Sequence, residues 1–135
     1  MKLSERNKFL YYSLLFLVIC LLDQISKHTA SLYFPYVCNR GISFGLGQNG
    51  LLFSLVALIF VLWFIVREKN KWQKLSLVLI LGAGTSNLLD RLFYGCVRDF
   101  INIGIIPTFN IADAIITLGV ILLLLNVIMR NKNET

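Results

Sequence analysis

The sequence predicts an all-α integral membrane protein with four transmembrane helices. Of its 135 residues 57% are hydrophobic and the mean hydropathy is +0.74, which is too apolar for an ordinary soluble domain. Four apolar runs reach or approach the roughly 20 residues that cross a bilayer. Basic residues gather in the N-terminal arm, in the linker after the second run and in the tail. We expect a single domain, residues 1–135, with spans at about 9–30, 49–67, 75–92 and 110–129.

The flanks of the first and fourth runs indicate true spans. The first run is followed at once by Asp23 and Lys27, and no small-x-small site closes it, so it is not read as a cleavable signal. Before the fourth run, Pro107 ends the preceding segment and Asn110 is a good N-cap. Asp113 then lies in the first helical turn, where the helix dipole favours a carboxylate.

The charges predict the orientation. The N-terminal arm, the linker after the second span and the tail together hold nine Lys and Arg residues and three glutamates, so this side carries the whole net charge of +6. The positive-inside rule makes that side, and both termini, cytoplasmic. The basic balance therefore reflects topology and contact with anionic membrane lipid, and does not argue for nucleic-acid binding.

All four aspartates of the chain fall on the opposite, outer side. Helical rise places the polar residues of the spans in the outer third of a hydrocarbon core about 30 Å thick. Their spacing of three or four residues forms one polar stripe on each helix. Stripes in lipid must face one another or a wet cleft and usually mark function. The stripes comprise Asp23 and Lys27, then Asn87, Asp90 and Arg91, and finally Asn110 and Asp113.

Two carboxylates, Asp99 and Asp113, suit hydrolysis of an amide. If they lie close they share one proton, and the pair supplies a base for water and an acid for the carbonyl or leaving amine. The 13-residue segment between them is long enough for them to meet. His28 is the one histidine, so a three-histidine metal site is impossible. A cysteine nucleophile or zinc site using His28 is a weaker alternative.

The outer segments have strand and turn composition. Residues 33–50 are rich in aromatic, β-branched and glycine residues, and residues 95–102 are also expected to be extended. On an extended chain Arg98 and Asp99 point to opposite faces, so Arg98 need not neutralise Asp99. Cys38 and Cys96 both lie outside, where an oxidising compartment would permit a disulfide. Cys20 is expected to be a lipid-buried hydrophobe.

Five blocks in order resemble the bacterial lipoprotein signal peptidase family, also called signal peptidase II. They are DQISK (Asp23–Lys27), NRGISF (Asn39–Phe44), GAGTSNLLDRL (Gly82–Leu92), VRDF (Val97–Phe100) and FNIAD (Phe109–Asp113). Within these blocks Ser86, Arg98, Arg40 and Ser43 depart from the family pattern, which has glycine before the asparagine and an apolar residue before the first aspartate. Each block alone is weak evidence, but five in order across four spans are strong evidence.

The resemblance implies an intramembrane aspartyl endopeptidase of the bacterial inner membrane, with its active site on the extracytoplasmic side. Its substrates would be prolipoproteins, cleaved before a diacylglyceryl-modified cysteine, and a monomer without metal or cofactor is expected. Asp99 and Asp113 would be the catalytic dyad. Asn39 would lie in a small extracytoplasmic β-cradle over the cleft. The residues that would order the site or hold substrate are Asp23, Lys27, Asn39, Asn87, Asp90, Arg91 and Asn110.

Two other functions fit the residues less well. A small proton-coupled transporter also uses intramembrane carboxylates, but it would need one near the midplane, and these crowd one side. A non-catalytic protein, or a degenerate relative of the peptidase, could use polar stripes only to hold its helices together. Uncharged side chains would serve that purpose at a lower desolvation cost.

Overall fold

The computed structural model describes residues 4–41 and 49–134. Four of its helices are long and apolar enough to cross a membrane, which confirms the four predicted spans. Residues 42–48, which include Ser43 and Phe44 of the loop block, lie outside the described residues. The helices are α1 (Glu5–Tyr33), α2 (Gly50–Arg67), α3 (Lys71–Tyr94) and α4 (Ile111–Glu134), and the strands are β1 (Val37–Asn39) and β2 (Val97–Asp99).

Two of the helices, α1 and α3, begin before the apolar runs because their polar ends are capped. Ser4 accepts a hydrogen bond from the backbone N–H of Asn7 at the start of α1. Asn70 does the same for the N–H groups of Trp72 and Gln73 at the start of α3. Such caps satisfy backbone donors that the first helical turn leaves free. The helices therefore begin in the charged linkers, several residues before the apolar runs.

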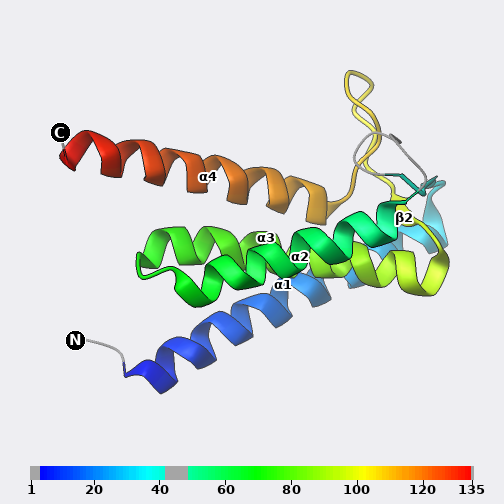
Figure 1. Cartoon of the computed structure of the whole chain (residues 1–135). Coiled ribbons are helices and arrows are strands. Elements are labelled where there is room, and N and C mark those ends of the chain that lie inside the picture. Colours follow the sequence, from blue (N-terminus) through cyan, green and yellow to red (C-terminus); the bar gives the residue numbers. More distant parts are fainter. Residues whose placement is uncertain (1–3, 42–48, 135) are drawn as a thin grey trace.

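Helix α3 is the centre of the bundle and packs against each of the other three helices. Half of its most apolar window is buried, against 17% or less for the others. Figure 1 shows that the start of α1 and the end of α4 lie at one end of the bundle, and the two strands at the other. Small residues make the close contacts: Gly82 packs on Ile19, and Gly119 packs on Ile80.

The interior holds charged and amide side chains beside a small apolar core, and the exterior is apolar, unlike the surface of a soluble protein. The side chains of Asp23, Lys27 and Asp90 are completely buried. Large apolar side chains such as Phe60 and Leu124 are instead exposed on the outside of the helices. This distribution suits a surface covered by lipid, because polar groups there face inward and toward one another.

The two strands form a small antiparallel sheet, as the predicted β-cradle requires. Cys38 lies opposite Arg98 in the register, and Asn39 lies opposite Val97. Cys38 and Cys96 form a disulfide, which settles the pairing that the sequence left open. The disulfide joins β1 to the residue immediately before β2.

The chain turns sharply on both sides of β2. Gly95 ends α3 in the left-handed conformation (φ +73°), which glycine adopts without a Cβ penalty. After β2 an isolated bridge pairs Ile101 with Phe109, so the segment between them folds back on itself. The two legs of this hairpin lead from Asp99 on one side to the start of α4 on the other. The sheet and the first turn of α4 are thereby brought together.

Candidate active site

The start of α4 is closed by a reciprocal pair of hydrogen bonds. The Oδ1 of Asn110 accepts from the backbone N–H of Asp113 at 2.9 Å, and the Oδ2 of Asp113 accepts from the backbone N–H of Asn110 at 3.3 Å. This is the geometry of a capping box, with Asn110 at the predicted N-cap. The cap fixes the Asp113 side chain at the end of the helix that lies next to the sheet.

Asp99 approaches from β2 and meets the same asparagine. Its Oδ1 accepts from the Nδ2 of Asn110 at 2.7 Å, and its Oδ2 accepts from the Nδ2 of Asn39 at 3.1 Å. The side chain is 1% exposed. Burial, followed by the nearby negative charge of Asp113, raises the pKa of Asp99 to about 6.

The structure therefore brings Asp99 and Asp113 together, with Asn110 bound to both. A second amide completes the arrangement: the Nδ2 of Asn87, from α3, donates to Asp113 Oδ1 at 2.8 Å, and the Nδ2 of Asn110 also donates to Asn87 Oδ1 at 3.2 Å. Each carboxylate thus receives hydrogen bonds from two neighbours. Two such carboxylates held in a water-poor site favour a state with one shared proton.

Lys27 lies behind the pair and holds Asn87. Its Nζ is 2.6 Å from Asp23 Oδ2 and donates to Asn87 Oδ1 at 2.7 Å. Asp23 in turn accepts a hydrogen bond at 2.7 Å from the backbone N–H of Ala112, so α1 supplies an anion to the start of α4. The polar stripe predicted on the first span, Asp23 and Lys27, thus lies inside the bundle, where Asp23 binds the start of α4.

Arg98 points away from Asp99, as strand alternation predicted, and pairs with Asp90. Its Nη2 lies 2.8 Å from Asp90 Oδ1. Sequence reasoning did not find Gln24, whose amide donates to Asp90 at 2.9 Å and to the hydroxyl of Ser86 at 3.0 Å. Gln24 lies in the DQISK block, but it follows Asp23 by one residue and so falls outside the i,i+4 stripe, which is why the spacing did not indicate it.

Arg91 faces α2 rather than the carboxylates. Its Nη1 donates to the hydroxyl of Ser54 at 3.1 Å and its Nη2 to the carbonyl of Gly41 at 2.8 Å. Within the part of the chain that the structure describes, the Nε of Arg91 is buried and has no hydrogen-bond partner. Ser54 was not predicted, since a lone serine in an apolar run carries no sequence signal.

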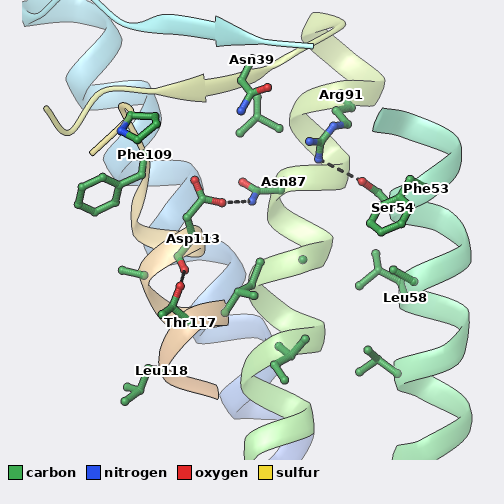
Figure 2. Close-up of a pocket in the computed structure, with 18 of the residues that line it drawn as sticks. Asn39, Phe53, Ser54, Leu58, Asn87, Arg91, Phe109, Asp113, Thr117 and Leu118 are labelled. Carbon is green, nitrogen blue, oxygen red and sulfur yellow. Dashed lines mark hydrogen bonds between the residues drawn. The ribbon is translucent and has the colours of Figure 1, made fainter. Parts of the chain in front are cut away.

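A cavity of about 660 Å³ lies between α2, α3 and α4. Figure 2 shows its polar end, near the sheet, where Asn39, Asn87, Arg91 and Asp113 gather. Further along the helices the lining becomes apolar, with Leu58 and Leu118 on opposite walls. The cavity joins a carboxylate site to an elongated apolar groove inside the span region. Across residues 4–41 and 49–134, no group of three His, Cys, Asp or Glu side chains is placed to hold a metal ion.

The chain has clear relatives among known proteins. Residues 15–129 match the family model described as signal peptidase (SPase) II. A lipoprotein signal peptidase of Syntrophomonas wolfei is 39% identical, over 88% of this chain and 93% of that protein. One from Caldicellulosiruptor bescii is 31% identical, over 91% and 94%. A solved bacterial membrane enzyme, 23% identical, shares the fold with a TM-score of 0.81 over 93% of this chain and 92% of that one.

Proposed function

The chain belongs to the signal peptidase II family, and we propose that it is an aspartic endopeptidase with Asp99 and Asp113 as its catalytic pair. It removes signal peptides from prolipoproteins by cleaving before a diacylglyceryl-modified cysteine. The observation that carries this proposal is the meeting of the two carboxylates on one asparagine, Asn110, with Asp113 of the pair lining the polar end of an apolar cavity.

The reaction needs one proton on the pair. The ionised carboxylate takes a proton from water while the water oxygen attacks the carbonyl carbon of the scissile bond, and the protonated carboxyl gives its proton to the carbonyl oxygen. The tetrahedral gem-diol intermediate then collapses. The C–N bond breaks as the proton taken from water moves to the leaving amine, and one gem-diol hydroxyl returns its proton to the carboxylate that had protonated the carbonyl oxygen. The products are a carboxylic acid and an amine, and the pair again holds one proton. The raised pKa of Asp99, about 6, supports a shared proton that the pair keeps up to about pH 6, well above the ordinary range of an aspartate.

The cavity suits a substrate with a long apolar part and one reacting bond. The apolar walls between α2 and α4 would take the hydrophobic segment or the acyl chains, while the peptide backbone lies at the polar end. Asn39 and Arg91 line that end.

The topology follows from charge and fold together. The helix ends opposite the sheet carry the basic linker and tail, so we propose that both termini are cytoplasmic and that the cradle faces outward. The membrane is then the bacterial cytoplasmic membrane. The protein acts there as a monomer surrounded by lipid.

The experiment compares one peptide in two forms, with and without diacylglycerol on its cysteine, in lipid nanodiscs. We expect cleavage only of the lipidated form. Mass spectrometry of the products should show that the cleaved bond is the one before the cysteine. Asp113→Asn should abolish cleavage while the protein still inserts. The control Glu5→Gln changes an exposed carboxylate at the end of α1 away from the sheet and should leave cleavage unchanged. Near-normal turnover by Asp113→Asn, or equal cleavage of both peptides, would refute the proposal.

A further inference from the structure

Arg98 is deeply buried, yet the proposed reaction gives it no task. The side chain is 4% exposed, and its Nη2 and Nε donate to the two oxygens of Asp90 at 2.8 and 3.2 Å. Its guanidinium lies 4.0 Å from the centre of the Tyr94 ring, and Nη2 also donates to the side-chain Oε1 of Gln24 at 3.2 Å. A bidentate, stacked and buried arginine is held in one geometry.

The surrounding charges indicate what Arg98 contributes. Asp23, Lys27 and Asp90 are fully buried, and the Lys27 ammonium is 2.6 Å from Asp23 but 3.5 Å from Asp90. Without Arg98, one ammonium would have to balance two buried carboxylates. An unbalanced buried carboxylate is costly and draws its neighbours toward itself. Arg98 supplies the second cation and leaves Lys27 to Asp23.

Lys27 then has a donor left for the catalytic pair. It donates to the Oδ1 of Asn87, and this fixes the amide so that Nδ2 faces Asp113 at 2.8 Å. If Lys27 moved toward Asp90, Asn87 would lose the contact that sets its orientation. The charge of Arg98 therefore bears on Asp113 through Lys27 and Asn87.

A second route runs through the backbone to Asp99. The N–H of Arg98 donates to Asp90 Oδ2 at 2.9 Å, so α3 holds β2 at the residue immediately before Asp99. The same Asp90 oxygen accepts from the Arg98 side chain. The Asp99 carboxylate reaches Asn110 at 2.7 Å from this fixed point. Loss of the guanidinium would free Asp90 to rotate and loosen the strand.

We propose that Arg98 is a positioning residue for the Asp99–Asp113 pair, acting through Asp90. By pairing with Asp90 it holds β2 against α3 and leaves Lys27 free to orient Asn87. This inference rests on the proposed peptidase function. It concerns a residue that does not line the cavity and does not touch the substrate.

The test measures kcat and KM for the diacylglyceryl peptide with Arg98→Met and Arg98→Lys. We expect Arg98→Met to lower kcat by about 10- to 100-fold, because small displacements of reacting groups have effects of that size. KM should change by less than about threefold, since the cavity is untouched. Arg98→Lys restores the charge but not the bidentate fork, so kcat should recover to within about tenfold of wild type. Arg67→Met is the matched control, because Arg67 is an exposed arginine that also stacks on an aromatic ring, Trp63, but lies at the end of α2 away from the sheet.

A double variant tests the route through Asp90. Arg98→Met leaves Asp90 as a buried carboxylate without its close cation, and Asp90→Asn removes that charge. We therefore expect the double variant to have a higher kcat than Arg98→Met alone. A kcat no higher in the double variant would contradict the route.

Size-exclusion chromatography measures the amount of folded enzyme, and kcat is reported per folded molecule. An effect on folding is thereby separated from an effect on positioning. The inference is overturned if Arg98→Met keeps kcat within about twofold of wild type, or raises only KM. If Arg98→Met does not fold, Arg98→Gln decides, because it removes the charge but keeps a polar donor for Asp90: a lowered kcat at constant KM supports the inference and an unchanged kcat refutes it. Failure of the proposed function would look different, because the wild-type protein itself would not cleave.

Discussion

Removing the Cys38–Cys96 disulfide should both destabilise the protein and slow it. The perturbation is the double substitution Cys38→Ser with Cys96→Ser, which opens a closed segment with a sequence separation of 58 residues. For a free chain, loop closure of that length contributes about 4 kcal/mol at 25 °C. Helices α2 and α3 lie within the segment and stay inserted when the fold opens, so we expect a loss of about 2–4 kcal/mol.

The same substitution should reach the active site through Asn39. This residue follows Cys38 on β1, and its amide donates to Asp99 at 3.1 Å. If β1 separates from β2, that hydrogen bond to a carboxylate is lost. Hydrogen bonds to charged groups contribute about 1.5–3 kcal/mol, so kcat/KM should fall by about tenfold or more.

The assay is unfolding in a mixed-micelle denaturant series, together with kcat/KM on the lipidated peptide, each with and without a reductant. Cys20→Ser is the control, because Cys20 is the free thiol on α1 and should leave both quantities unchanged. Reductant should lower the stability of wild type and Cys20→Ser but not that of the double variant. A double variant as stable and as active as wild type would refute the reasoning.

Three further outcomes follow from burial and contact. Lys27→Met leaves Asp23 buried without its cation and should reduce the unfolding free energy by about 3–5 kcal/mol, measured in the same denaturant series. Because the pKa of Asp99 is raised to about 6, kcat/KM should fall as pH rises through 6 and the pair loses its shared proton. The unfolding free energy should also fall as pH rises from about 4 to 6, since the folded protein binds that proton more tightly than the unfolded chain does. A flat pH–rate profile would contradict this. Gly119→Ala would set a Cβ 2.8 Å from Ile80 Cγ1 and should lower the unfolding free energy by about 1–3 kcal/mol, while an unchanged midpoint would disprove close packing there.

The fold could be predicted because a bilayer leaves few choices. Four long apolar runs predicted the number of helices, and the structure agrees. The helix ends were less accessible to prediction. Helix α1 begins at Glu5, because Ser4 caps a polar first turn that hydropathy alone does not detect. Nor could hydropathy reveal that α3 is central, since that depends on which faces of the helices meet.

The site was predictable where a local pattern implied a local bond. Asn110 and Asp113 are three residues apart and cap each other, and Asp23 and Lys27 are four apart and form an ion pair. Strand alternation also predicted that Arg98 turns away from Asp99. Its partner Asp90 could not be predicted, because that contact depends on how the Gly95 turn sets β2 against α3.

The central claim is that Asp99 and Asp113 act as one catalytic unit. Single-turnover cleavage of the diacylglyceryl peptide should be measured for Asp99→Asn, Asp113→Asn and the double variant, each inserted and folded. Because the two carboxylates share one task, either single substitution should abolish cleavage and the double variant should be no slower than the singles. Substantial cleavage by either single variant, or losses that multiply in the double variant, would contradict the account.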